Sequence, residues 1–172
     1  MSKVIILEGI DGSGKSTLAA EFEKSIKLRQ PNANVIRAHR GPMIGSVEDE
    51  YLRPIYDLEE NDVLIADRWH VGEMIYGPIY RGHSQIRSVI GEVETFLDLY
   101  KAIRIIMSPS ISVVEQRLQD RGEDYLLPHH VAEVHEFYEA FAIVFKYKKI
   151  ANWNQIFIDQ ILDQLFEEKT EC

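Results

Sequence analysis

The chain has 172 residues, 45% of them hydrophobic, so it can bury a sizeable core and is too apolar for a disordered protein. Its 28 acidic and 19 basic residues give a formal net charge of -9, which disfavours tight binding to a nucleic-acid backbone unless cations gather locally. A single cysteine, Cys172, excludes an intrachain disulfide, and no apolar run approaches the roughly 18 residues of a membrane span.

The predicted elements alternate between short apolar strands and amphipathic helices. The first apolar run is too short for a secretion signal, which together with the single thiol predicts a cytoplasmic protein. In chain order we predict strand 4–7, helix 15–28, strand 35–38, helix 46–58, strand 62–67, helix 85–100, strand 102–107, helix 111–120, helix 128–148, strand 156–159 and a final acidic helix.

This alternation predicts an α/β fold for one domain, residues 1–172. Continuous β-branched and aliphatic runs are typical of strands buried on both faces, as in a parallel sheet with right-handed crossovers. We therefore expect a three-layer sandwich in which helices cover both faces of a parallel five-stranded sheet. Ligands bind such sheets beyond the carboxyl ends of the strands.

The first strand leads into the pattern G-x-x-x-x-G-K-[ST] at residues 9–16, and a predicted helix follows. Backbone N–H groups of such a loop surround phosphates, and the helix adds the positive end of its dipole. The pattern predicts a P-loop NTPase, with Lys15 on the β- and γ-phosphates of ATP and the Ser16 hydroxyl on Mg²⁺. The predicted nucleotide-binding residues are Gly9, Asp11, Gly12, Ser13, Gly14, Lys15, Ser16 and Thr17.

A second motif, Asp67-Arg68-Trp69, follows the strand predicted at residues 62–67. Asp67 there could hold Mg²⁺ or orient an acceptor, and the alternative is that it only caps the next helix. Arg68 could clamp a phosphate through two parallel hydrogen bonds.

The phosphate loop at residues 8–17, the Asp67-Arg68-Trp69 triplet and residues 116–124 resemble the thymidylate kinase family and its deoxynucleoside kinase relatives. The resemblance covers most of the chain, although this chain is somewhat short for the family. It implies ATP, Mg²⁺ and a nucleotide acceptor, and it extends to the homodimer that thymidylate kinases commonly form.

The resemblance also assigns roles within the acceptor site. It places Asp11 near the sugar 3′-hydroxyl, Arg68 on the acceptor phosphate or the transferring group, and Tyr76 under the sugar. Two departures are Gly72, where the family has serine, and Gly77, where it has a glutamine that helps to select thymine. Residues 69–82 could instead form a different base pocket, with Trp69, His70, Tyr76, Tyr80 and Arg81 suited to stacking, or these side chains could be core or helix surface.

A lid is expected at residues 117–128, because related kinases close this region over the phosphates. Arg117 and Arg121 are four residues apart and share one helix face, so either could reach the transition state. The alternative is a solvated pair of arginines beside acidic neighbours.

The second predicted strand ends at His39 and Arg40. Deoxynucleoside kinases place a glutamate base near this point, and residues 35–40 contain no carboxylate. This favours an acceptor phosphate, which is already an anion, with Arg40 or Arg53 as further ligands. His39 as a base would keep a hydroxyl acceptor open.

The sequence therefore favours transfer from ATP to a deoxynucleoside monophosphate. One alternative is a kinase of a hydroxyl group, on a deoxynucleoside or on hydroxymethylated pyrimidine in DNA, as in some phage-type relatives. The other is an ATP-binding switch without catalysis.

Overall fold

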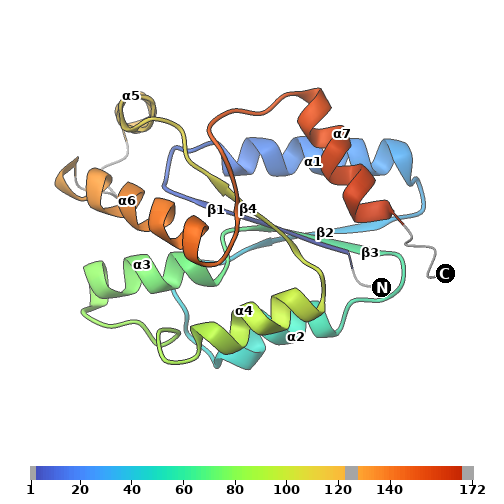
Figure 1. Cartoon of the computed structure of the whole chain (residues 1–172), viewed down its shortest axis with the longest axis horizontal. Coiled ribbons are helices and arrows are strands. Elements are labelled where there is room, and N and C mark those ends of the chain that lie inside the picture. The colour runs from blue at the N-terminus through green and yellow to red at the C-terminus, as the bar shows by residue number, and fades with distance from the viewer. Residues whose placement is uncertain (1–2, 123–127, 168–172) are drawn as a thin grey trace.

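A computed structural model of the chain describes residues 3–122 and 128–167. Within these residues, five parallel strands form one sheet in the order β2-β3-β1-β4-β5 (Figure 1). The strands are β1 (Lys3–Gly9), β2 (Asn34–His39), β3 (Asp62–Asp67), β4 (Ile103–Met107) and β5 (Lys148–Ile150). The predicted α/β fold with a parallel sheet is confirmed.

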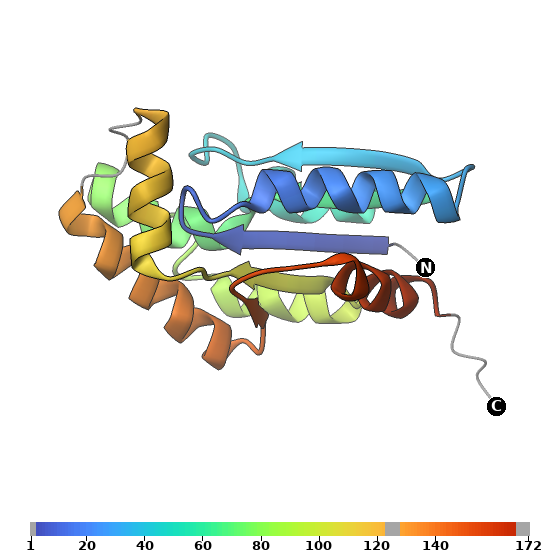
Figure 2. The same ribbon diagram turned by 90° about the horizontal axis from the view of Figure 1, so that it is seen from above.

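Helices pack on both faces of the sheet. They are α1 (Lys15–Arg29), the π-helical turn η1 (Glu48–Leu52), α2 (Arg53–Tyr56), α3 (His70–Arg81), α4 (Ile90–Leu99), α5 (Ile111–Arg121), α6 (Pro128–Val144) and α7 (Gln155–Phe166). Helices α1 and α7 cover one face and α2, α3 and α4 the other, whereas α5 stands beyond the carboxyl ends of the strands (Figures 1 and 2). In the described parts of the chain, no helix is long and apolar enough to cross a membrane.

The alternation of side chains along β1 explains the three layers. Ile5 packs with Phe22 of α1 and Ile161 of α7, whereas the next residue, Ile6, packs on the opposite face with Leu97 of α4. All five side chains are fully buried, and burying each stabilises the fold by about 1.5–3 kcal/mol.

The carboxyl-terminal prediction was partly wrong. Residues 156–159 are not a strand but lie in α7, where Asn154 caps the helix by accepting a hydrogen bond from the N–H of Phe157 at 3.0 Å. The fifth strand is β5, which begins at Lys148, inside the helix predicted for residues 128–148. The chain turns at Lys146, which has a φ of 57°, and this turn separates α6 from β5.

Helix α3 was not among the predicted elements, because a helix after Asp67 was raised only as an alternative and without bounds. Two other helices are shorter than expected. The segment predicted as helix 85–100 becomes helical only at Ile90, and the predicted helix 46–58 is divided into η1 and α2, with Pro54 at the start of α2. Apolar side chains of α3 that face the core, such as Val71 and Ile75, are four residues apart, which is helical spacing.

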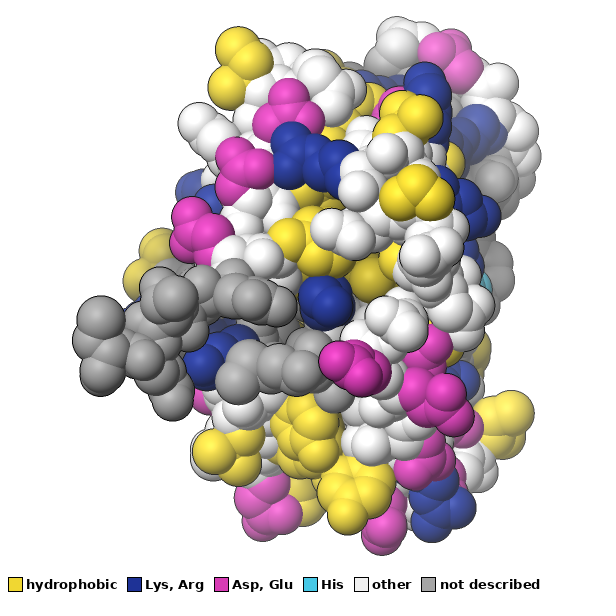
Figure 3. All heavy atoms as spheres, turned by 90° about the vertical axis from the view of Figure 1, so that its right-hand side faces the viewer, with side chains coloured by type: hydrophobic (Ala, Val, Ile, Leu, Met, Phe, Trp, Pro, Cys, Tyr) yellow, Lys and Arg dark blue, Asp and Glu magenta, His cyan; other side chains and the backbone are white. Residues whose placement is uncertain are grey.

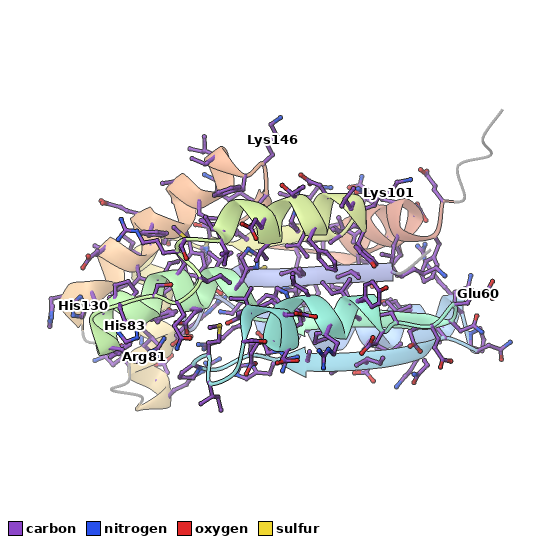
Figure 4. The ribbon with its side chains drawn as sticks, turned by 90° about the horizontal axis from the view of Figure 1, so that it is seen from below. Glu60, Arg81, His83, Lys101, His130 and Lys146 are labelled. Atoms are coloured by element: carbon purple, nitrogen blue, oxygen red, sulfur yellow. The ribbon has the colours of Figure 1, made fainter. Side chains whose placement is uncertain are left out.

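The two ends of the molecule differ. At the end where the strands begin, basic and acidic side chains are interspersed with hydrophobic ones (Figure 3). At the other end, where the strands finish, Arg81 and His83 project from the region of α3, far from Glu60 (Figure 4). In open parallel sheets, ligands bind beyond the carboxyl ends of the strands, which is the end that carries Arg81 and His83.

Candidate active site

The phosphate loop, residues 9–16, joins the carboxyl end of β1 to the start of α1. Gly9 has a φ of 138°, and a Cβ on it would lie 2.4 Å from the carbonyl oxygen of Met107 in β4. Gly14, with a φ of 102°, precedes α1 as its amino-terminal cap. A side chain at either position would be strained, which is why the glycine pattern produces this turn.

Lys15 is buried inside the loop and is bound by loop oxygens. Its Nζ donates to the carbonyl oxygens of Gly9 at 2.7 Å and Ile10 at 2.8 Å, and lies 3.3 Å from the Oγ of Ser13. Burial, followed by the neighbouring Arg68 guanidinium, lowers the pKa of Lys15 to about 8. A triphosphate in this position would favour the charged form and raise this pKa.

Ser16 and Asp67 meet where the loop passes the end of β3. The Oγ of Ser16 donates to Oδ2 of Asp67 at 2.5 Å, and Oδ1 of Asp67 is buried with no hydrogen-bond partner. A hydroxyl and a carboxylate fit Mg²⁺, which prefers oxygen ligands and keeps water or substrate phosphates for its other positions. The described residues contain no cluster of three or more His, Cys, Asp or Glu side chains that could hold a metal by themselves.

Arg68 sits on a strained turn beside Asp67. It has a φ of 71°, unusual for a residue with a side chain, and its guanidinium pairs with Asp11 of the phosphate loop. The buried carboxylate of Glu8 fixes the turn, because its Oε1 accepts hydrogen bonds from the N–H groups of Trp69 at 2.9 Å and Val71 at 3.0 Å. Glu8 therefore ties β1 to the segment that orients Arg68.

Two cavities meet at Arg68. The first, here called the loop cleft, encloses about 310 Å³ and is lined by Lys15, Ser16, Thr17, Asp67, Arg68 and Arg121, among others. The second, called the helix cleft, spans about 500 Å³ of space that is open to solvent and lies between the phosphate loop, the segment after β2 and α3. Its lining includes Asp11, Arg40, Arg68, Glu73, Tyr76 and Arg81.

Buried polar atoms without partners gather around these clefts. Among the described residues they include Oε2 of Glu8, Oδ1 of Asp67, Nε of Arg68 and the hydroxyl of Tyr138. Each such atom costs about 1–3 kcal/mol when left unsatisfied, and native folds contain few of them. Their concentration here indicates a place that a polar ligand fills.

The two arginines of the expected lid occupy different positions. Nη1 of Arg117 donates to the carbonyl oxygens of Gly12 at 3.0 Å and Ser13 at 3.2 Å, so Arg117 braces the phosphate loop. Arg121, one turn later at the end of α5, lines the loop cleft. The rest of the expected lid includes residues 123–127, which lie outside the described residues.

Three predicted substrate ligands are not in the clefts. Trp69 is a correction: its ring is 1% exposed and packs edge-on against Tyr51, so it has no open face for a base. Arg53 lies on α2 and pairs with Asp49 at 3.0 Å, and His39 is exposed and lines neither cleft. Arg40 does line the helix cleft, with its guanidinium 5.0 Å above the Trp69 ring.

Glu73 was missed by the sequence analysis. It lines the helix cleft from α3 and is bonded to Arg81, eight residues further on. The signal was the spacing Glu73, Gly77, Arg81, which places an acid, a gap and a base on one face of a helix. It was invisible because no helix was predicted there.

No family model matches the chain. The SPbeta prophage-derived uncharacterized protein YorR of Bacillus subtilis is 25% identical, over 78% of this chain and 79% of that protein. The thymidylate kinase of Caldicellulosiruptor saccharolyticus is 27% identical, over 87% of this chain and 86% of the enzyme. That of Caenorhabditis elegans is 33% identical, over 46% of this chain and 42% of the enzyme.

Solved structures share the fold. The match to the crystal structure of B. subtilis YorR in complex with phosphorylated GDP covers 94% of this chain and 94% of that chain, with a TM-score of 0.65 and 22% identity. Deoxyadenosine kinase from M. mycoides with bound dATP covers 96% of this chain and 100% of that chain, with a TM-score of 0.54 and 17% identity. The solved structures show the shared fold, and the sequence likeness to thymidylate kinases, together with the phosphate loop and the position of Arg68 between two clefts, identifies the chain as a P-loop nucleotide kinase.

Proposed function

We propose that the protein transfers the γ-phosphoryl group of ATP to the phosphate of a deoxynucleoside monophosphate, with Mg²⁺ as cofactor. The observation that carries this proposal is that Arg68 lines both clefts. A guanidinium at their junction can bind the acceptor phosphate and the transferred group together, and neutralising that charge is the main task in phosphoryl transfer.

On the donor side, the loop cleft would hold the triphosphate. Lys15 would exchange the carbonyl oxygens of Gly9 and Ile10 for the β- and γ-phosphates, and Arg121 would approach the γ-phosphate from α5. Ser16 and Asp67 would hold Mg²⁺, which supplies charge neutralisation to the phosphates when bound.

On the acceptor side, the helix cleft would hold the monophosphate. Arg68 orients its phosphate, and Asp11 and Tyr76 lie where the sugar would pass. An acceptor oxygen forms a bond to the γ-phosphorus while the bond from that phosphorus to the β–γ bridging oxygen breaks, giving ADP and a nucleoside diphosphate. The acceptor phosphate is already an anion, so no base is needed.

A hydroxyl acceptor is the second candidate, because Oδ1 of Asp67 is buried without a partner and could accept the hydroxyl proton. A DNA acceptor is less well supported. The cations that could form a track along DNA are each paired with an acid: Arg40 with Glu50, Arg53 with Asp49 and Arg81 with Glu73. We also propose a cytoplasmic location, where ATP is consumed, and a homodimer as the assembly.

The decisive experiment measures ADP release with ATP and Mg²⁺ against the deoxynucleoside monophosphates and the deoxynucleosides. We expect turnover with monophosphates, and a loss of roughly 100-fold in kcat/KM in Arg68→Ala. Arg87→Ala, an exposed arginine outside both clefts, is the matched control. Turnover only with nucleosides would establish the hydroxyl candidate instead. ATP binding without acceptor-dependent turnover would indicate a switch.

A further inference from the structure

A buried carboxylate lies in the wall of the helix cleft. The side chain of Glu73 is 1% exposed; its Oε1 accepts a hydrogen bond from Nη2 of Arg81 at 2.5 Å and its Oε2 accepts one from the N–H of Met43 at 3.1 Å. A carboxylate has about four acceptor sites and an arginine five N–H donors, so both groups retain hydrogen-bonding capacity. Burying a charged pair carries a desolvation penalty unless hydrogen bonds satisfy its remaining lone pairs and N–H groups.

Gly77 provides the space for this pair. It lies between the two residues on the same face of α3, and a Cβ on it would lie 3.0 Å from Oε1 of Glu73, 3.1 Å from Nη2 of Arg81 and 2.7 Å from the carbonyl oxygen of His83. A side chain at position 77 would therefore push the ion pair apart. The Glu73–Arg81 pair replaces the side chain that would otherwise point from position 77.

The pair is next to flat aromatic surfaces. The rings of Tyr76 and Tyr80 both line the helix cleft and are nearly parallel, at 19°, with centroids 6.2 Å apart. The cleft has Arg68 and Asp11 on its phosphate-loop side and Arg81 towards the end of α3. A ligand whose phosphate is on Arg68 would extend its planar base along α3, towards Glu73 and Arg81.

We infer that the Glu73–Arg81 pair reads the base of the acceptor and selects one with an exocyclic amino group. This inference rests on the proposed function of the helix cleft as the acceptor site. The pair presents an acceptor, the carboxylate, directly beside a donor, the guanidinium. Guanine, adenine and cytosine each offer an amino donor with a ring or carbonyl acceptor close to it, and carboxylates and guanidiniums recognise such edges in nucleic acids.

Thymine and uracil fit the pair poorly. Their ring N–H and one adjacent carbonyl could meet the carboxylate and the guanidinium. Their second carbonyl, on the other side of that N–H, would then direct its lone pairs at the carboxylate, whereas an amino-bearing edge has no such second acceptor. One good two-point contact between side chain and base discriminates by roughly 10- to 100-fold. We expect kcat/KM to favour the best amino-bearing acceptor over its thymine and uracil counterparts by that factor.

The test measures kcat/KM with dGMP, dAMP, dCMP, dTMP and dUMP, and with the matching deoxynucleosides. Base preference is read within whichever series is turned over, so a preference seen only among nucleosides would refute the monophosphate proposal and support the base inference. If neither series turns over, the five monophosphates are compared by calorimetric binding. Equal or better use of dTMP, or equal binding, overturns the inference.

Two variants separate base reading from a structural role. Glu73→Gln places an amide, which both donates and accepts, beside Arg81, and we expect the amino-base preference to fall at least about tenfold as dTMP improves relative to the others. Arg81→Lys keeps the charge of a half-exposed residue but loses the planar fork, and should weaken the same preference. Glu92→Gln on α4, exposed and outside the cleft, is the control. Equal loss with every acceptor would show that the pair only supports the fold.

Discussion

The loop cleft and the helix cleft share Arg68 but are built in different ways. The loop cleft depends on backbone geometry: glycines at positive φ, a helix start and a few residues adjacent in sequence. The helix cleft depends on side chains from α3 and from the segment after β2, which approach only through the fold. A site made by a local turn is visible in a sequence motif, whereas a site made by a helix face is visible only once that helix is recognised.

The largest expected effect tests whether the two clefts are independent. Lys15→Ala removes the buried ammonium of the loop cleft, and we expect kcat to fall by roughly 1000-fold with every acceptor alike. Measuring kcat for each acceptor checks this, with Lys27→Ala, an exposed lysine at the end of α1, as control. If base preference changed as well, the clefts would be coupled and the comparison would fail.

A smaller effect would separate the roles of two arginines, Arg121 and Arg117, at the loop cleft. Arg121→Ala should lower kcat by about 100-fold with little change in ATP affinity, because Arg121 lines the cleft without holding the loop. Arg117→Ala should instead weaken ATP binding by about tenfold, since it releases two backbone carbonyls of the phosphate loop. Steady-state kinetics and calorimetry of ATP binding distinguish them, and identical profiles for the two variants would contradict the assignment.

The smallest expected effect is the uptake of a proton by Lys15 when ATP binds, which should not accompany binding of the acceptor. The pKa of Lys15 is lowered to about 8 in the free protein, and phosphate anions favour its charged form, so ATP raises it. Below that pH Lys15 already carries its proton; above it, ATP binding takes up a proton and ATP affinity falls as the pH rises. Calorimetry near pH 9 in two buffers with different ionisation enthalpies should detect uptake with ATP. Lys15→Met should abolish it, and uptake in that variant would assign the proton elsewhere.

The sequence predicted the sheet better than the helices. The apolar runs of β1, β3 and β4 have few alternatives as structures, so these strands lie where they were expected. The run at residues 156–159 was ambiguous because Ile156, Phe157 and Ile158 suit either element; the Asn154 cap and the burial of Ile161 decided for a helix. Helix α3 was missed because Gly72, Gly77 and Pro78 are unfavourable for helices in isolation.

The site shows the same division. The phosphate loop, Ser16 and Asp67 lie together as their motif and strand-end positions predicted, while their catalytic roles stay predictions. Trp69 was misjudged because an aromatic residue after a strand suits a core as well as a base pocket. Glu73 could not be found from the chain alone, since its importance depends on Arg81 two turns away and on Met43 in another segment.

Under the proposed role of the Glu73–Arg81 pair, a substitution at Gly77 alone would change which acceptors the protein prefers. The position determines whether an ion pair can close over α3, and it touches neither the phosphate loop nor Arg68. A single codon change there could exchange one set of metabolites for another while the machinery that handles ATP stays intact. Under the proposed role of the Glu73–Arg81 pair, acceptor choice and ATP handling are set by different residues, and one can change without the other.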